Sequence, residues 1–245
     1  MPTLRSIDNG LLNKAPCFIL HKHPYKERDL LLELLTLEYG RLRAICRLGK
    51  SAQLRNNALL QSFVPLRLTL FKGRGELYNV GEIRQEGAAF KIAIPNLFCA
   101  QYLNEILYKL CHEEESIPEL FGIYLKTLKL LEQGVTPHLP LRLFESVFLK
   151  NLGYALDVCD NQGHAFLDNS LYTFDVRNGF ALSLDQSLDC YQGAILNKIA
   201  LGDYASPEVL VALKRLHSQL LQMLLDYKPL QSHKLYSQYL SLQEI

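Results

Sequence analysis

The sequence predicts an α+β protein: a small closed β-barrel at the N-terminus, then a mostly α-helical domain with a small β insertion. Three observations support this prediction. Apolar residues alternate with a period of two in the first third of the chain. From about residue 96 they recur with the 3.6-residue period of helices, and the two parts carry opposite net charges. A chain of 245 residues can bury two cores, so we place the predicted domains at residues 1–85 and 86–245.

Five short strands with turn signals between them are predicted in the first domain, enough for a small barrel. Their expected ranges are residues 17–20, 30–36, 41–47, 63–71 and 76–83, with a loop at 48–62. The third strand alternates most clearly. One face carries Leu42, Ala44 and Cys46, and the other carries Arg41, Arg43, Ile45 and Arg47. This strand is therefore expected to show an apolar back to the core and a cationic front to solvent.

Helical spacing returns in several later segments. The expected helices span residues 96–112, 118–131, 139–152, 206–226 and 232–240. Ser206-Pro207-Glu208 is the best start signal, with a capping hydroxyl, proline at the first helical position and an acid in the first turn. An insertion at residues 157–187 is predicted to contain a hairpin, with strands 172–176 and 179–183 joined across Arg177-Asn178-Gly179.

The charge distribution points to a nucleic-acid partner. Residues 1–80 hold 13 Lys and Arg against six Asp and Glu, a balance of +7, whereas residues 81–245 hold 13 against 19, a balance of −6. Lys and Arg that neutralise phosphates provide most of the sequence-independent affinity for nucleic acid. The candidate cations of the barrel are Lys22, Lys26, Arg28, Arg41, Arg43, Arg47, Lys50, Arg55, Lys72 and Arg74.

Aromatic side chains near these cations would stack on nucleobases if they were exposed. The candidates are Tyr25, Tyr39, Phe71 and Tyr78. Phe71 and Tyr78 are expected to belong to the barrel core instead. Tyr25 lies beside Pro24 in a polar stretch, and the sequence leaves its role open.

No motif for catalysis or nucleotide binding is present: GxxxxGK[ST], GxGxxG, GxSxG and HExxH are all missing. We therefore predict no catalytic residue and no cofactor. Residues 113–115 are three consecutive glutamates, expected to be a solvated charge run. His21 and His23 would share a strand face but lack a nearby third metal ligand. A partial zinc site at Cys159, His164 and Cys190 lacks paired spacing, so no metal is predicted, although this site stays open.

The six cysteines are scattered, without a CxxC pair, and no disulfide framework is expected. Cys17, Cys46, Cys99 and Cys111 lie among apolar neighbours and are expected to be buried free thiols. The N-terminal residues lack the apolar run of a secretory signal. No stretch of about 18 apolar residues occurs. A cytoplasmic protein is therefore expected.

Several segments together resemble the RecO family of bacterial recombination mediators. The matching segments are Phe18-Ile-Leu-His-Lys-His-Pro-Tyr-Lys-Glu-Arg-Asp, Tyr39-Gly-Arg-Leu-Arg, Leu60-Gln-Ser-Phe-Val-Pro-Leu, Lys72-Gly-Arg-Gly-Glu-Leu, Tyr102-Leu-Asn-Glu-Ile-Leu, Pro118-Glu-Leu-Phe, Leu141-Arg-Leu-Phe-Glu, Leu152-Gly-Tyr and Lys228-Pro-Leu-Gln-Ser-His-Lys-Leu. Their order and spacing extend over about residues 15–240. Many relatives have a four-cysteine zinc module after Leu152-Gly-Tyr, where this chain keeps only Cys159, so the resemblance is to the zinc-free branch.

The resemblance implies an OB-fold barrel and a helical C-terminal domain. It also implies a protein that binds single- and double-stranded DNA, anneals complementary strands and works with RecR. Together they would help RecA replace single-strand-binding protein (SSB) on DNA, without nucleotide or catalysis. Nothing in the sequence demands more than a monomer, so we expect a cytoplasmic monomer that is associated with the nucleoid when bound to DNA.

The resemblance also assigns residues to these roles. Phosphate contact is expected from the barrel cations, chiefly Lys22, Arg28, Arg41, Arg43, Arg47, Lys50, Arg55, Lys72 and Arg74. Arg142 matches a basic position that grips the acidic, Phe-ending tail of SSB. Secondary DNA contacts are expected at Lys214, Arg215, Lys228 and Lys234.

Three other functions stay open from the sequence. The chain could be an OB-fold adaptor that binds RNA and has no part in repair. It could be a metal-dependent nuclease that uses the acidic residues of the second domain, or a scaffold that binds only proteins. Binding to labelled single-stranded DNA, with and without magnesium, separates these three.

Overall fold

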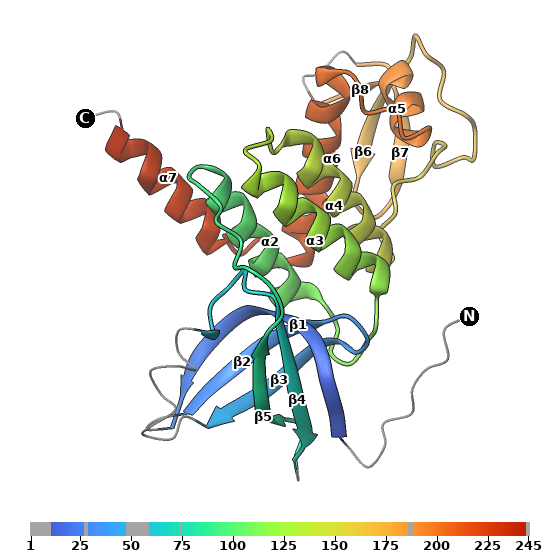
Figure 1. The fold of residues 1–245 in the computed structure, drawn as a ribbon. Coiled ribbons are helices and arrows are strands. Elements are labelled where there is room, and N and C mark those ends of the chain that lie inside the picture. The colour runs from blue at the N-terminus through green and yellow to red at the C-terminus, as the bar shows by residue number, and fades with distance from the viewer. Residues whose placement is uncertain (1–10, 27–28, 48–58, 74, 186–188, 244–245) are drawn as a thin grey trace. The chain divides into compact units, whose positions relative to one another are not determined.

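The computed structural model describes residues 11–26, 29–47, 59–73, 75–185 and 189–243 (Figure 1). The chain forms two compact units. The first contains residues Met1–Val135 and Leu230–Ile245, and the second contains Thr136–Pro229. The change from strands to helices near residue 85 therefore falls inside the first unit. As a boundary between domains it stays a prediction.

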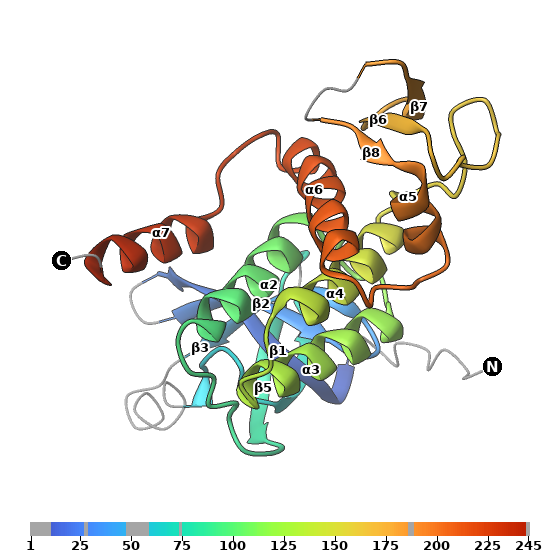
Figure 2. The ribbon, with the colours of Figure 1, turned by 90° about the horizontal axis from the view of Figure 1, so that it is seen from above.

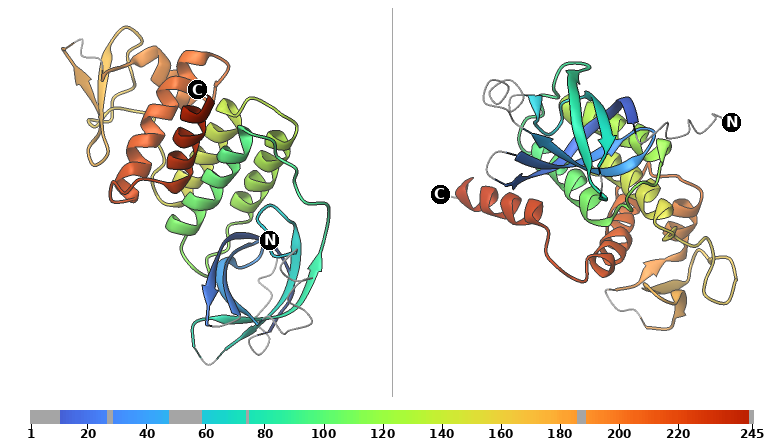
Figure 3. Two further views of the ribbon diagram at one scale, coloured as in Figure 1. Left: turned by 90° about the vertical axis from the view of Figure 1, so that its left-hand side faces the viewer. Right: turned by 90° about the horizontal axis from the view of Figure 1, so that it is seen from below.

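The first unit begins with a closed β-barrel, in the strand order β1-β2-β3-β5-β4 (Figure 3). The strands are β1 Leu11–Tyr25, β2 Asp29–Thr36, β3 Gly40–Arg47, β4 Leu66–Lys72 and β5 Tyr78–Gln85. All neighbours are antiparallel except β3 and β5, which pair in parallel only at Ala44 with Tyr78 and Ile45 with Asn79. Five strands closed in this order form an OB-fold. The predicted α+β fold class is confirmed.

The barrel core follows from the period of two in the strands. On β3 the buried residues are Leu42, Ala44 and Cys46, and the arginines alternate with them on the outer face, as predicted. β1 is much longer than the predicted run at 17–20, because it pairs with both β2 and β4 and so closes the barrel. The polar residues that interrupt its apolar pattern, such as His21, lie on its outer side.

In its described residues, the same unit also contains the helices α2 Asn96–Leu110, α3 Pro118–Glu132 and α7 Gln231–Gln243. Figure 2 shows α7 beside α2, against which it packs. A buried amide joins the helices to the barrel. Nδ2 of Asn104 donates to the carbonyls of Ile19 and Leu20, at 3.3 and 3.2 Å, and the Tyr124 hydroxyl donates to Oδ1 of Asn104 at 2.6 Å.

In the second unit the described residues form three helices and a small sheet. The helices are α4 His138–Asn151, α5 Gly193–Ala200 and α6 Pro207–Leu224, and the sheet has the order β7-β6-β8, with β6 Leu171–Asp175, β7 Gly179–Ser183 and β8 Tyr191–Gln192. α6 begins where the sequence predicts, because the Ser206 hydroxyl accepts from the Val209 N–H at 3.4 Å. The five predicted helices are all present, with ends within two or three residues.

The predicted hairpin is present, but its turn is one residue earlier than expected. Gly179 pairs with Asp175 as the first residue of β7, so the loop is residues 176–178. Gly179 has a φ of +74°, which favours glycine, and Oδ1 of Asp175 accepts from the N–H groups of Arg177 and Asn178. The third strand β8 and the helix α5 were not predicted.

All six cysteines are free thiols. Cys17, Cys46 and Cys111 are buried as expected, whereas Cys99 is only half-buried. Burial raises the pKa of Cys46 to about 11 and that of Cys111 to about 12. The three buried thiols thus behave as small apolar groups. None of the helices in the described ranges is long and apolar enough to cross a membrane.

Candidate nucleic-acid interface

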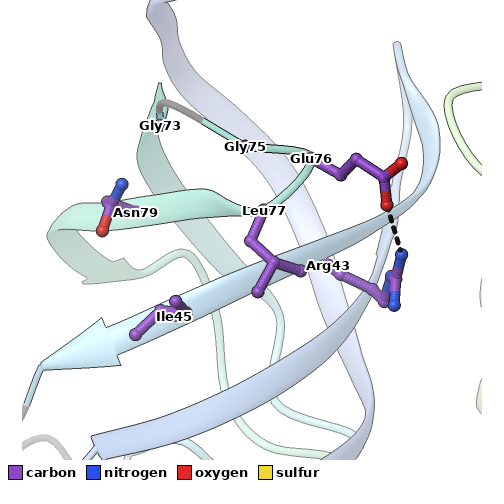
Figure 4. Close-up of a pocket in the computed structure, with 7 residues that line it drawn as sticks. All are labelled: Arg43, Ile45, Gly73, Gly75, Glu76, Leu77 and Asn79. Carbon is purple, nitrogen blue, oxygen red and sulfur yellow. Dashed lines mark ion pairs between the residues drawn. The ribbon is translucent and has the colours of Figure 1, made fainter.

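A shallow groove of about 410 Å³ lies on the outer surface of the barrel (Figure 4). Its lining residues come from β3, the β4–β5 connection and the start of β5: Arg43, Ile45, Gly73, Gly75, Glu76, Leu77 and Asn79. The groove forms because β3 and β5 pair over only two positions. Figure 4 shows Leu77 extending from the connection toward β3, between Ile45 and Arg43. OB-fold proteins bind oligonucleotides and oligosaccharides on this region of the barrel.

Arg41 lies at the start of β3, and each of the three nitrogens of its guanidinium bonds to a residue of the first unit. Nη1 bonds to Glu33 at 2.5 Å, Nη2 to Glu113 at 2.8 Å and Nε to the Cys111 carbonyl at 3.0 Å. The Arg41 side chain is only 13% exposed, and that of Glu33 is 7% exposed. This arginine therefore neutralises a buried carboxylate and holds residues 111–113 against the barrel.

Residues Glu113–Glu115, named here the acidic segment, lie along the edge of β3. The Glu114 N–H donates to the Arg41 carbonyl at 2.9 Å. Gly40 permits this close approach, because a Cβ there would lie 1.8 Å from the Glu115 carbonyl oxygen. The three glutamates are exposed, as predicted, but Glu113 and Glu114 are also ion-paired with the barrel.

Arg43 and Lys72 are the cations at the groove that the acidic segment contacts. Nε of Arg43 lies 2.9 Å from Glu113, and its Nη2 lies 3.5 Å from Glu76. Lys72 bonds to Glu114 and sits 4.5 Å above the Tyr78 ring. The hydrogen bond between them raises the pKa of Lys72 and lowers that of Glu114. Both cations are about one-third exposed and so reach solvent.

The other predicted barrel cations differ in their surroundings. Arg47 is exposed at the end of β3 and forms no ion pair with any residue that the structure describes. Lys22 donates to the Leu60 carbonyl at 3.0 Å. Lys26 is exposed, 5.6 Å from the centre of the Tyr25 ring. Four further predicted DNA contacts lie outside the described residues: Arg28, Lys50, Arg55 and Arg74.

The predicted aromatic residues also differ in their exposure to solvent. Tyr78 is buried in the barrel core, as expected. The expectation that Phe71 is a core residue is wrong, because it is 46% exposed. Leu68 and Leu70 take the inward positions of β4, and the alternation of the strand then turns Phe71 outward. Tyr25 is half-buried.

The predicted cations of the helical region fall in both units. Arg142, on α4, is buried: its Nη2 bonds to Glu145 at 2.5 Å, and Glu145 in turn bonds to Nδ1 of His217 at 2.9 Å. Lys214 and Lys228 are exposed in the second unit. Arg215 lies 3.5 Å from Asp189 and packs over the Tyr191 ring. Lys234 is exposed on α7, in the first unit.

The second unit has a cavity of its own, of about 170 Å³, which sequence reasoning did not identify. Its lining residues are Ser146, Leu149, Lys150, Tyr154, Ala155, Leu156, Asp157, Val158, Ile199, Ala200, Tyr204, Leu213 and His217. Most of these side chains are apolar, and Lys150 is exposed. The cavity has room for an apolar side chain beside a cation.

The possible zinc ligands do not converge. His164 lies 3.5 Å from Asp160, and the Cys190 thiol donates to the Asp185 carbonyl. No group of three or more Cys, His, Asp and Glu side chains placed to hold a metal ion occurs within the described ranges.

The fold defines the class of this protein: an OB-fold protein with a helical C-terminal region and a groove on its barrel. Family models for the recombination protein O N-terminal and C-terminal regions match residues 12–86 and 93–232. The chain is 36% identical to the DNA repair protein RecO of Pseudomonas entomophila over 90% of its own length and 96% of the relative's. It is 32% identical to that of Aliivibrio fischeri, over 90% and 93%. The chain belongs to the RecO family.

Proposed function

We propose that this protein is a DNA-binding mediator of recombinational repair in a bacterium. It binds single- and double-stranded DNA and anneals complementary strands. With RecR, it helps RecA to load onto single-stranded DNA coated with SSB. Membership of a family whose relatives are named DNA repair proteins supports the repair role.

The observation that best supports DNA binding is the set of cations around the barrel groove. Arg43 lines it, Lys72 precedes the connection that forms one wall, and Arg47 extends from the far end of β3. We assign phosphate contact to these three, with Lys22 and the predicted cations outside the described residues as further contacts. Arg41 takes a different role, since its donors already serve Glu33, Glu113 and Cys111.

The SSB tail is proposed to bind the second unit. Arg142 was the expected partner for the tail carboxylates, but its guanidinium is buried against Glu145. Lys150 is exposed and lines the apolar cavity there. We therefore assign the terminal Phe of the tail to this cavity and its carboxylates to Lys150.

Annealing of complementary strands precoated with SSB tests the proposal. The assay is run without nucleotide at two salt concentrations, with intact SSB and with SSB lacking its tail. We expect faster annealing with intact SSB, less acceleration at high salt and a loss of acceleration without the tail. RecA loading is then measured with and without RecR.

No acceleration by the folded protein, even with RecR, would contradict the mediator role. An unlabelled RNA strand serves as competitor. Preferential binding to RNA would support instead the adaptor function that the sequence leaves open.

A further inference from the structure

A row of outward-facing residues crosses the barrel at the level of the groove. Leu31 pairs with Ile45, Ile45 with Asn79, Asn79 with Phe71, and Phe71 with Leu11. Paired residues on adjacent strands point to the same side of a sheet. The sequence neighbours of this outer row, Leu32, Ala44, Tyr78, Leu70 and Leu12, are all buried in the core. The outer row therefore forms an apolar band on the outside, interrupted only by the amide of Asn79.

Phe71 is the most exposed member of the outer row, and contacts with neighbouring strands hold its ring in place. The edge of its ring meets the backbone of β5 at Gly81, where an added Cβ would lie 2.4 Å from Cε2 of the ring. A side chain at residue 81 would displace the ring, so the ring can hold this position only with glycine there. Leu11, 40% exposed, flanks the ring on the neighbouring strand. An exposed aromatic ring held in this way is a platform for a flat partner.

Asn79 lies beside Phe71 in the outer row and lines the groove. Its side-chain amide forms no hydrogen bond with another residue in the described part of the chain. It thus presents two donors and one acceptor oxygen next to the platform. Such a group can hydrogen-bond to the edge of a nucleobase that stacks on the ring.

Cations border the outer row. Arg43 and Arg47 lie two residues on either side of Ile45, on the same face of β3, and Lys72 follows Phe71. A ligand with flat apolar groups on a polyanionic backbone complements this arrangement. In a duplex the flat faces of the bases are covered by stacking, so only a single strand presents both features.

We infer that the outer row binds unstacked bases of single-stranded DNA, with Phe71 as the stacking platform and Asn79 as a hydrogen-bonding partner of the stacked base. This inference rests on the proposed function and deepens it, since the cations alone would bind any polyanion. The platform gives the barrel a preference for single strands over duplexes.

The test uses the full chain, which contains no tryptophan. The variant Phe71→Trp therefore places one fluorescent reporter on the platform. The probes are oligothymidylate, an abasic oligonucleotide of the same length and a blunt duplex of that length. We expect oligothymidylate to quench the tryptophan, and the abasic strand and the duplex to bind without quenching.

A second set of variants measures affinity. Phe71→Leu keeps apolar bulk but removes the aromatic face, and it is expected to weaken oligothymidylate binding by about fivefold or more. Binding to the abasic strand should not change. Phe71→Tyr, the matched control, should retain wild-type affinity, and Asn79→Ala should weaken binding only to strands that carry bases.

Three other results would contradict the inference or the proposed function. DNA binding without tryptophan quenching, together with normal affinity of Phe71→Leu, would overturn the base platform and leave the proposed function intact. Equal losses on the abasic and base-bearing strands, with a lower melting temperature, would show that the ring is structural and overturn the inference. Failure of the wild-type chain to bind any DNA would overturn the proposed function itself.

Discussion

Nη2 of Arg41 and Oε1 of Glu113 lie 2.8 Å apart, although 72 residues separate them in the sequence. The same glutamate also contacts Arg43, and its neighbour Glu114 contacts Lys72. The acidic segment thus occupies side chains to which we assign phosphate contact. A DNA phosphate must compete with these carboxylates for Arg43 and Lys72.

This competition predicts that the acidic segment limits DNA affinity. Glu113→Gln and Glu114→Gln release one cation each for phosphate contact, so we expect tighter binding and a steeper dependence on salt. Glu115→Gln is the matched control, because Glu115 is exposed in the same segment and forms no ion pair among the described residues. Binding isotherms at several salt concentrations provide the measurement. If Glu115→Gln tightens DNA binding as much as the other two variants, the effect comes from the change in net charge of the protein and not from competition for Arg43 and Lys72.

Arg41 and Arg47 lie on the same face of β3, but we predict that Arg41 stabilises the fold and that Arg47 binds DNA. Arg41→Ala leaves Glu33 buried without its cation, which is expected to cost about 3 kcal/mol in the free energy of unfolding. Arg47→Ala should leave stability unchanged, weaken DNA binding and reduce the salt slope by about 0.7–1. Thermal unfolding and salt titrations separate the two effects. If the Arg41→Ala protein is stable but binds DNA more weakly, Arg41 contacts phosphate, as the sequence predicts.

Local patterns in the sequence were sufficient to predict β3 and α6. A period of two fixes the two faces of β3, and Ser206 caps α6 through an N–H only three residues away. β8 and α5 were missed because a two-residue strand and an eight-residue helix are too short to show a period. Helix α5 also starts at Gly193, where packing against the Leu167 carbonyl leaves no room for a Cβ.

The candidate site was predicted only in part, for a related reason. Composition located the cations, but an ion pair such as Arg43 with Glu113 depends on which distant segment the fold brings near. The outward position of Phe71 follows from alternation with Leu68 and Leu70, which lie with it in the expected strand 63–71, so the sequence contained this signal. The cavity near Lys150 combines residues from 146 to 217, and no local motif marks it.

Glu105 is predicted to make the anchoring of α7 sensitive to acid. Burial would raise the pKa of this carboxyl, but hydrogen bonds from Lys109 and from the Ser232 and Gln231 N–H groups outweigh it and lower the pKa to about 2. Because the folded pKa lies below the ordinary value of 4.5, the stabilisation is complete above about pH 4.5. It is lost as the pH falls toward 2.

The variant Glu105→Gln tests this anchoring. It weakens the cap on the first N–H groups of α7, which is expected to cost about 1–2 kcal/mol at neutral pH. The difference in unfolding free energy between wild type and variant should shrink as the pH falls from about 4.5 to 2, because the protonated wild-type carboxyl also loses these bonds. Denaturant titrations at a series of pH values measure the difference. A difference that stays constant across this range would show that ionisation of Glu105 does not hold α7.

Of two cations on α4, Arg142 is expected to stabilise the second unit and Lys150 to bind the SSB tail. The Glu145 side chain is 2% exposed and lies between Arg142 and His217, so Arg142→Ala uncovers a buried charge and is expected to destabilise the second unit by about 3 kcal/mol. Lys150→Ala removes an exposed cation beside the cavity, so it should weaken binding of an acidic peptide ending in Phe without changing stability. Thermal unfolding and fluorescence anisotropy of the labelled peptide measure both quantities. An Arg142→Ala protein that unfolds normally but loses the peptide would show that Arg142 binds the tail, because a purely structural arginine cannot give that combination.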